Sequence, residues 1–514
     1  MIPVVITTSG TGSRLYSYTK YTNKSLVKVG DKYAICHIIE SYPISTRFVI
    51  TLGYYGKFVR DFLSLAYPDY NIQYVEVDCY EGPMSSLGYS LYSARMFLQE
   101  PFIFHCCDTI LREKINIIGE NMVFVSKDPN YMTYSSITIN NSLIKSFHPK
   151  GYSNNDYIYI GILYISDYKL FWDILGDIIK ENPYDTSLSD INVISKMIEN
   201  GTLFTYKVID KFYDTGNIES YINVCNDFKS KYDILEKNDE SLCFLDTNVI
   251  KFFYNNEINM KRVKRGNDLY PLVPKILGYK DNYMAMEYIN GKLLSEYKSY
   301  GEIYKLLNWA KANLWINPDI NHKYIDICKN FYYTKTINRI KSLPFLDKEI
   351  NNINGLHIGS MDLLLDKVIF TDLYTDTFYK FHGDFILDNI MKVNTTYILL
   401  DWRQDFGNEL YHGDMYYDLA KLRHNIIFNH KNITNKMFSI EESDNKVYID
   451  LKCNYNLMKQ LDDYNKFINE NSYNLKKIEI LTAIIWLNMS PLYSGDLSKF
   501  LYYFGKMNLY LAIN

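Results

Sequence analysis

The chain has 514 residues, of which 47% are hydrophobic, and its formal net charge of −4 is spread along the sequence. This length exceeds what one hydrophobic core normally organises, so two or more domains are expected. The lack of a strongly basic segment argues against a nucleic-acid partner. No apolar run approaches the roughly 20 residues that cross a bilayer, so we expect no membrane insertion.

The eight cysteines are scattered and form no Cys-x-x-Cys pair. This distribution is typical of free thiols in a reducing compartment and not of a disulfide framework or a zinc site. The first short apolar run also lacks the basic flank of a secretory signal, so the sequence predicts a cytoplasmic protein. Nothing in the sequence indicates an oligomeric state.

The N-terminal segment places a glycine-rich turn directly after an apolar run, Val4 to Thr7, that predicts a buried strand. Small and basic residues follow it: Gly10, Gly12, Ser13, Arg14 and Lys24. Backbone amides of such a turn can approach a triphosphate, and the two basic side chains can neutralise its charge. A glycine turn alone would fit an ordinary tight turn about as well, so the neighbouring residues decide the interpretation.

The run from Val4 to Glu40 resembles the sugar nucleotidyltransferase family, which opens with Gly-x-Gly-x-Arg and continues with Pro-Lys-x-Leu. Asn23 stands at the position of the proline and Lys24 at that of the lysine. The resemblance implies that Arg14 and Lys24 act in catalysis. It also implies a set of nucleotide-binding glycine-turn residues: Gly10, Gly12, Ser13 and, in a later turn, Gly82.

Two aspartates further along extend this resemblance. Asp108 follows an apolar run, Pro101 to Cys106, and an aspartate at the end of a buried parallel strand lies where α/β sheets bind ligands. A capping or turn role would explain Asp108 alone nearly as well. Asp214, before a Thr-Gly turn, resembles the second metal aspartate of the family. The resemblance implies that both bind one Mg²⁺, which holds the α-phosphate while a phosphomonoester attacks.

The segment from residue 240 onward contains a lysine, Lys251, at the centre of the apolar run Asn248 to Phe253. A buried lysine is costly unless it is paired, whereas a lysine on an edge strand can simply face water, and both interpretations remain open. No glutamate on a following helix is an obvious partner, and Glu257 is the nearest candidate. A second apolar run, Tyr283 to Gly291, carries Glu287 and Tyr288 near its end.

The stretch from Phe381 to Phe406 has the spacing that phosphoryl transfer requires. Asp384 is followed five positions later by Asn389, and Asp401 ends the apolar run before it. One carboxylate can orient the attacking hydroxyl, while an amide and a second carboxylate can hold Mg²⁺ on the phosphates of ATP. The alternative, a hairpin with incidental acidic residues, would not require this spacing.

The order of these residues matches the catalytic loop of protein kinases. The tripeptide motifs His-Gly-Asp and Asp-Trp-Arg resemble those of the aminoglycoside phosphotransferase and choline kinase family. The resemblance implies that Asp384 is catalytic and that Asn389 and Asp401 bind Mg²⁺. It further implies that Lys251 contacts the α- and β-phosphates. Adenine would be received by a hinge that contains two neighbouring residues, Glu287 and Tyr288.

Residues around this loop are expected to support it. Asp418, in a segment resembling the family's Asp-x-x-x-Asp-Leu-Ala helix, should brace the loop. His382 should pack and form hydrogen bonds, because Asp384 suits the role of base better. Arg403 could contact phosphate or pair with Asp405, and the sequence does not decide between them. The helical C-terminal region from residue 454 to residue 514 lies where related kinases form the acceptor pocket.

The two resemblances predict an α/β nucleotidyltransferase domain at residues 1–230, with a Rossmann-like mixed sheet and helices on both faces. An α+β kinase-like domain, with a small N-lobe and a largely helical C-lobe, is predicted at residues 231–514. We expect the first to fold alone. The predicted activity is bifunctional: ATP phosphorylates a small sugar or amino alcohol, and a second nucleoside triphosphate, with CTP among the candidates, activates the phosphomonoester for decoration of a surface glycan. Alternatively, only one half is active and the other is a binding scaffold.

Overall fold

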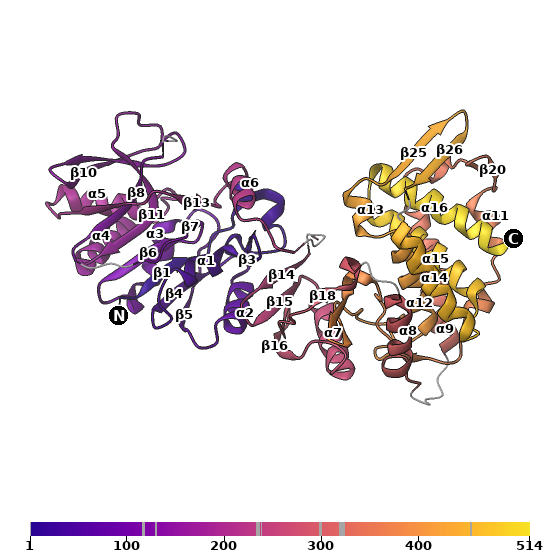
Figure 1. Cartoon of the computed structure of the whole chain (residues 1–514). Coiled ribbons are helices and arrows are strands. Elements are labelled where there is room, and N and C mark those ends of the chain that lie inside the picture. The colour runs from indigo at the N-terminus through magenta and orange to yellow at the C-terminus, as the bar shows by residue number, and fades with distance from the viewer. Residues whose placement is uncertain are drawn as a thin grey trace. The chain divides into compact units, whose positions relative to one another are not determined.

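The computed structural model describes residues 2–115, 119–128, 131–232, 237, 239–297, 301–317, 324–452 and 455–514, apart from the side chains of residues 455 and 457. The chain forms two compact units (Figure 1). The first comprises Met1–Asn256 and Leu277–Tyr288, and the second comprises Glu257–Ile276 and Ile289–Asn514. None of the described helices has the length and apolar character needed to cross a lipid bilayer.

A nine-stranded sheet forms the centre of the first unit. Its strands are β1 (Val4–Thr7), β4 (Arg47–Leu52), β5 (Asn71–Glu76), β6 (Phe102–Cys106), β8 (Met122–Ser126), β9 (Ser136–Asn140), β10 (Leu143–His148), β11 (Tyr157–Ile165) and β12 (Thr205–Val208). Their order is β10-β9-β11-β6-β1-β4-β5, with β8 beside β11 and β12 beside β8. The strands from β6 to β5 run parallel, whereas β11 runs antiparallel to its neighbours, which confirms the predicted mixed sheet.

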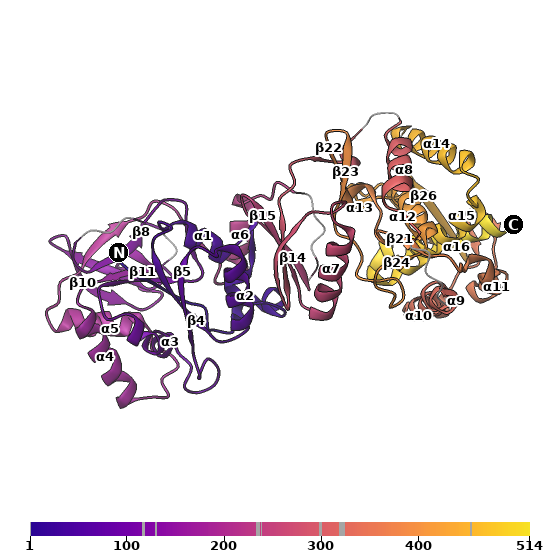
Figure 2. The ribbon, with the colours of Figure 1, turned by 90° about the horizontal axis from the view of Figure 1, so that it is seen from below.

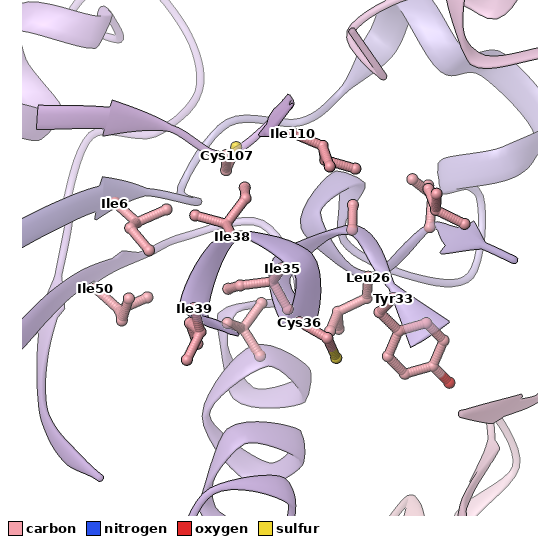
Figure 3. Packing of buried hydrophobic residues seen from close by; sticks show 14 of the residues in the cluster. Ile6, Leu26, Tyr33, Ile35, Cys36, Ile38, Ile39, Ile50, Cys107 and Ile110 are labelled. Atoms are coloured by element: carbon pink, nitrogen blue, oxygen red, sulfur yellow. The ribbon is translucent and has the colours of Figure 1, made fainter. Parts of the chain in front are cut away.

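Helices cover both faces of this sheet. Alternate side chains of its buried strands point to opposite faces, so both faces are apolar and must be covered. Val5 of β1 belongs to one apolar cluster, and Ile6 belongs to the other. One face is covered by α1 (Ala34–Glu40), α2 (Gly56–Ala66) and α6 (Ile218–Asp227), the other by α3 (Leu87–Ser93), α4 (Tyr168–Glu181) and α5 (Asp190–Glu199) (Figures 1 and 2). Figure 3 shows α1 contributing Ile38 and Ile39 to the cluster that contains Ile6 and Ile50.

A small two-stranded ladder lies beyond the end of β6. It consists of β7 (Thr109–Leu111) and β13 (Phe212–Asp214), which pair antiparallel with Asp214 opposite Thr109. The pairing is extended by the Thr215 amide, which donates to the Asp108 carbonyl at 2.8 Å. The ladder therefore fixes the position of Asp214 relative to the end of β6.

A four-stranded sheet in the order β14-β15-β17-β16 follows in the sequence. Its strands are β14 (Glu240–Phe244), β15 (Asn248–Phe253), β16 (Ile276–Lys280) and β17 (Tyr283–Glu287). Buried residues of this sheet join the apolar cluster of the first unit: Cys243, Ile250, Phe252, Tyr283 and Ala285. Tyr283, for example, has its ring 5.9 Å from that of Phe62 on α2. This sheet thus packs with the first unit, although the expected boundary after residue 230 precedes it.

The second unit is predominantly helical. Its helices are α7 (Asn256–Leu269), α8 (Glu302–Asn313), α9 (Tyr324–Cys328), α10 (Lys335–Lys341), α11 (Met361–Asp366), α12 (Met415–Ile427), α13 (His430–Thr434), α14 (Tyr455–Glu470), α15 (Leu475–Met489) and α16 (Gly495–Ile513). The centre is formed by α15, which packs against both α12 and α16.

Short sheets flank these helices. One has the order β18-β22-β23, a second has the order β20-β19-β26-β25, and a third pairs β21 with β24. Their bounds are β18 (Lys292–Leu293), β19 (Asn352–Ile353), β20 (Leu356–His357), β21 (Tyr379–Lys380), β22 (Ile390–Val393), β23 (Thr396–Leu399), β24 (His412–Gly413), β25 (Phe438–Ser443) and β26 (Lys446–Leu451). The β22–β23 hairpin lies between two predicted site residues, Asn389 and Asp401. The likeness of this unit to kinases stays a prediction.

Candidate active sites

The glycine loop after β1 folds closely against Lys24. Gly12 has a φ of +66°, and a Cβ atom built there would lie 2.8 Å from the Lys24 Cβ atom. Glycine is thus required both by the left-handed backbone and by the close approach of the lysine. The space around Gly10 is open instead, since a Cβ atom there would meet nothing within 4 Å. Ser13 and Arg14 begin the 3-10 helix that follows and are exposed.

Asn23 holds Lys24 in place. It is fully buried, and its side-chain amide donates to the Thr8 and Tyr54 carbonyls at 2.8 and 2.6 Å. Its Oδ1 atom accepts hydrogen bonds from the Ser25 amide and hydroxyl at 2.9 and 2.8 Å. The first two hydrogen bonds join the loop to the ends of β1 and β4, and the other two fix the turn itself, so together they supply the rigidity that a proline would give at this position.

Lys24, Asp108 and Asp214 come together at the end of the sheet. Lys24 Nζ lies 3.2 Å from Asp108 Oδ2. A Cβ atom built on Gly216 would lie 3.0 Å from Asp108 Oδ2 and 2.9 Å from Asp214 Oδ1. The two carboxylate oxygens therefore cannot be further apart than these two distances combined. Gly216 leaves the space between them open, and its amide donates to Asp214 Oδ1 at 2.6 Å.

The two carboxylates titrate differently. Burial tends to raise the pKa of Asp108, but the charge and hydrogen bond of Lys24 outweigh it, so this pKa is below its ordinary value. Burial and the neighbouring charge of Asp108 raise the pKa of Asp214. Lys24 has a pKa above its ordinary value, because Asp108 outweighs the effect of burial. The positive charge near Asp214 thus does not offset its burial and the repulsion from Asp108, although Tyr134 donates a hydrogen bond to its Oδ2 atom at 2.8 Å.

This arrangement fits a magnesium ion. Carboxylate oxygens are the ligands that Mg²⁺ prefers, and two of them border the space left by Gly216. A divalent cation there would compensate the repulsion that raises the pKa of Asp214. In the part of the chain that the structure describes, no group of three or more His, Cys, Asp or Glu side chains forms a metal site. The predicted site therefore depends on this pair.

Two further glycines flank the sheet. Gly161, inside β11, has a φ of +82°, and a Cβ atom there would lie 2.9 Å from Cys106 Sγ. It allows β11 to pass close to the end of β6. Gly82 has a φ of +83° in an exposed turn, and a Cβ atom there would meet nothing within 4 Å. The structure therefore places Gly82 where the backbone is accessible.

Lys251 lies on β15, between β14 and β17, so it is not on an edge strand. Its side chain is 7% exposed, and its Nζ atom lies 3.4 Å from Glu240 Oε2 on the neighbouring strand. The candidate partner Glu257 instead pairs with Lys261 at 3.0 Å. This ion pair of Lys251 joins two neighbouring strands of the sheet.

The two predicted hinge residues end β17 in the first unit. Glu287 is half-buried. Tyr288 is 37% exposed, and its amide donates to the Thr247 carbonyl at 3.0 Å. Its hydroxyl lies 3.0 Å from that of Tyr232.

Asp418 on α12 holds the His-Gly-Asp loop of the second unit in place through hydrogen bonds. Asp418 is fully buried and accepts hydrogen bonds from the amides of His382 and Gly383 at 2.7 and 2.6 Å. Trp315 donates its indole N–H to the same carboxylate at 3.1 Å. The expected brace is therefore present.

His382 is held as a neutral ring. The Asp384 amide donates to its Nδ1 atom at 3.2 Å, and its Nε2 atom lies 2.8 Å from the Leu400 carbonyl, which can only accept. Burial is the main cause that lowers the pKa of His382 to about 4. His382 therefore positions the loop and is not placed to act as a base.

Asp384 forms an ion pair with Lys421 of α12, with 2.7 Å between Oδ1 and Nζ. Burial tends to raise its pKa, but Lys421 and Arg403 outweigh burial and hold this pKa well below the ordinary value. Asp384 is thus ionised at neutral pH. Asn389 donates its side-chain amide to the Asp384 carbonyl at 3.0 Å, which ties the two predicted site residues together.

Asp401, two residues after the end of β23, has a left-handed backbone conformation with a φ of +51°. This conformation is uncommon for a residue with a side chain and is typical of functional turns. Asp401 pairs with Arg262 of α7. Arg403 donates to the backbone carbonyl of Asp405 at 3.1 Å, while the carboxylate of Asp405 pairs with Lys261. The side-chain ion pair considered for Arg403 is therefore not formed.

Three basic residues that support the loop were not predicted: Arg262, Arg265 and Lys421. Arg265 is buried and donates to the Phe381 and Arg403 carbonyls. Lys421 follows Asp418 by three positions on α12, which places both on one helix face. Asn425, one turn further on, accepts from the Leu387 amide at 2.9 Å. The i, i+3, i+7 spacing of polar residues on this helix was a signal that could have identified Lys421.

Similar solved structures match the N-terminal part of this chain, at about 45% of its length. No protein-family model and no curated protein matches the chain. Solved structures similar to it include a CTP:phosphocholine cytidylyltransferase from Streptococcus pneumoniae, at 17% identity and a TM-score of 0.40, covering 44% of this chain and 99% of that one. A putative glucose-1-phosphate thymidylyltransferase from Bacillus anthracis has 21% identity and a TM-score of 0.39, covering 46% and 98%. An inositol-1-phosphate CTP transferase from T. maritima has 15% identity and a TM-score of 0.36, covering 46% and 98%.

Proposed function

We propose that this chain is a bifunctional enzyme with a nucleotidyltransferase in its first unit and a small-molecule phosphotransferase in its second. The observation that carries the first activity is the convergence of Lys24, Asp108 and Asp214 beside the glycine loop. The second is supported by Asp384, which is ionised, braced through its loop by Asp418 and joined to Asn389.

In the transferase, the glycine loop supplies backbone amides and Lys24 and Arg14 supply positive charge for a nucleoside triphosphate. Arg14 already influences both aspartates, since its charge lowers the pKa of each of them. A Mg²⁺ ion held by Asp108 and Asp214 would neutralise charge on the α-phosphate. A phosphate oxygen of the acceptor attacks the phosphorus atom of the α-phosphate. The bond between this phosphorus and the oxygen that bridges to the β-phosphate breaks, and pyrophosphate leaves.

In the phosphotransferase, Asp384 orients the hydroxyl of the acceptor and receives its proton. Asn389 and Asp401 supply the amide and carboxylate oxygens that would hold Mg²⁺, which would neutralise charge on the phosphates of ATP. The resemblance assigns contacts with the nucleotide to Lys251, Glu287 and Tyr288, which lie in the first unit. The terminal P–O bond of ATP breaks, a new bond forms to the hydroxyl oxygen, and ADP leaves.

The two reactions fit one sequence, because the phosphotransferase produces a phosphomonoester and the transferase consumes one. The product would be a nucleotide-activated compound suited to the decoration of a surface glycan. The second candidate, with a single active unit, is distinguished by measuring ADP and pyrophosphate separately. The full chain should form ADP with a hydroxyl acceptor and then release pyrophosphate when a second nucleoside triphosphate is added. Pyrophosphate release only from a supplied phosphomonoester would leave the transferase alone.

A further inference from the structure

Four basic side chains surround the His-Gly-Asp loop, and we refer to them as the cationic cluster: Lys335, Arg339, Arg403 and Lys421. They come from α10, from the turn after Asp401 and from α12. Lys335 Nζ lies 4.0 Å from the centroid of the Phe331 ring, and the guanidinium carbon of Arg403 lies 5.1 Å from the same centroid. The two charges therefore share one aromatic ring.

The cluster lies directly beside the proposed catalytic aspartate. The Arg403 amide donates to the His382 carbonyl at 3.0 Å, and a Cβ atom built on Gly383 would lie 2.6 Å from that of Arg403. Lys421 contacts Asp384 itself. On the other side, Arg339 donates to the Asn488 carbonyl of α15 at 2.9 Å. The cluster thus extends from the catalytic loop to the C-terminal helices, where the acceptor is expected.

Most of this positive charge is not neutralised by the protein. Among the residues that the structure describes, no carboxylate lies within ion-pair distance of Lys335, Arg339 or Arg403. The two carboxylates of the loop are already engaged, Asp384 with Lys421 and Asp401 with Arg262.

Two side chains of the cationic cluster have pKa values below the ordinary ones. Burial, together with the charges of Arg403, Arg339 and Lys421, holds the pKa of Lys335 well below its ordinary value. Burial and the charge of Arg403 likewise lower the pKa of Arg339, although Tyr417 acts in the opposite direction. Like charges held together in this way are unfavourable unless an anion joins them.

We propose that the hydroxyl compound phosphorylated in the second unit is itself an anion, whose carboxylate or phosphate group is bound by Lys335 and Arg339. This inference rests on the proposed phosphotransferase activity. The phosphates of ATP account for charge next to Asp384, but Lys335 and Arg339 continue toward α15, beyond what the transferred group requires. A cationic acceptor such as choline or ethanolamine would be repelled here, because the cluster places unpaired positive charge against it.

The first test compares matched acceptors with the full chain, by measuring ADP formation. The pairs are glycerate with glycerol and glucuronate with glucose; glycerol 3-phosphate distinguishes a phosphate from a carboxylate, and choline and ethanolamine represent cations. We expect anionic acceptors to have the higher kcat/KM, by about tenfold to a hundredfold, as one or two charge-assisted hydrogen bonds would give. A preference for the neutral or cationic compounds would overturn the inference and leave the phosphotransferase intact.

Two variants locate the effect. Lys335→Met keeps the packing on Phe331, and Arg339→Gln keeps a donor toward Asn488. Each should raise the KM for the anionic acceptor about tenfold and leave the KM for ATP unchanged. Lys341→Gln, at the exposed end of the same helix, is the matched control and should change neither. A rise in the KM for ATP alone would assign the cluster to the nucleotide and contradict the proposal.

Anion binding can be measured independently of the phosphotransferase activity. Thermal unfolding of Asp384→Asn, with sulfate or chloride at equal ionic strength, should show greater stabilisation by sulfate. Adding Lys335→Met should remove most of this difference and raise the midpoint without sulfate, because one repelling charge is lost. Equal sulfate effects with and without Lys335→Met would refute the anion site. If no acceptor in the panel is phosphorylated, the proposed phosphotransferase fails, and the sulfate experiment alone decides the anion site.

Discussion

The two candidate active sites are assembled in different ways. In the first unit, Asp108 and Asp214 come from strands far apart in the sequence and meet only because β7 pairs with β13. In the second, Asp384, Asn389 and Asp401 belong to one stretch that includes a hairpin, and α12 braces it. The first site therefore depends on the register of a ladder, whereas the second depends on a local turn and one helix face.

The sites also differ in their charge. The Lys24–Asp108 pair leaves Asp214 with excess negative charge, which suits a divalent cation. The cationic cluster leaves excess positive charge beside Asp384, which suits an anion. The two sites therefore require different ligands to compensate their charges, so a substitution at Asp384 should not disturb the chemistry at Asp108 and Asp214, or the reverse.

The strongest test of this independence is Asp384→Asn. It should reduce ADP formation by about 10²- to 10⁴-fold, because the carboxylate both orients the hydroxyl and accepts its proton. Pyrophosphate release from a supplied phosphomonoester should be unchanged. Asp372→Asn, an exposed aspartate of the same unit, serves as the control. Loss of both activities in a folded protein would show that the sites are not separate.

The converse test uses Asp108→Ala and Asp214→Ala. Each should reduce nucleotidyl transfer by about 1000-fold, since each removes several kcal/mol of charge stabilisation. The double variant should be hardly slower than either single variant, because both side chains serve one ion. Asp177→Ala, on the exposed side of α4, should have no effect. An additive double variant, or near-normal transfer by either single one at saturating magnesium, would reduce that aspartate to a structural role.

The limits of the first unit can be tested by truncation. A chain of residues 1–230 lacks the β14–β17 sheet, so Tyr33, Cys36 and Phe62 would lose apolar neighbours of their cluster. We expect it to be less stable toward urea than residues 1–288, by about 3 kcal/mol or more, the equivalent of one or two exposed core side chains. Equal stabilities would show that the first unit ends at residue 230, as its sequence predicts.

The smallest expected effect concerns pH. The pKa of His382 is about 4 in the folded chain, below the ordinary 6.5, so the unfolded chain binds a proton first as the pH falls. His382 therefore contributes no pH dependence above pH 6.5 and lowers stability below it, by about 2 kcal/mol between pH 6.5 and pH 5. His382→Gln should remove this contribution from the urea unfolding of the second unit. Identical pH dependence in the two proteins would mean that His382 keeps its ordinary pKa in the folded chain.

The sequence predicted elements whose causes are local. The apolar run Tyr157–Ile165 forms β11, and Ser189 caps α5, with its amide donating to Asn192 Oδ1 at 2.8 Å. The spacing of Asp384, Asn389 and Asp401 places them in one loop for the same reason. Asn23 could not be interpreted in this way, because two of its hydrogen bonds reach the Thr8 and Tyr54 carbonyls, which the sequence alone does not place nearby.

What the sequence could not predict depends on tertiary packing. The partner of Lys251 is on the adjacent strand, a matter of register, and Arg265 acts through backbone carbonyls that carry no sequence signal. The association of the β14–β17 sheet with the first unit likewise follows from which apolar faces meet. Alternating patterns show that a strand has a buried face, but they do not show what covers it.

The shared apolar cluster of that sheet has a consequence for how this protein can evolve. Strands that carry the proposed nucleotide contact Lys251 also cover α1 and α2. A lineage that no longer needed phosphorylation could lose most of the chain after Tyr288, yet deletion of the sheet would be selected against. Such descendants should therefore retain Cys243, Ile250 and Tyr283 as inherited remnants, while the residue at position 251 would be free to drift.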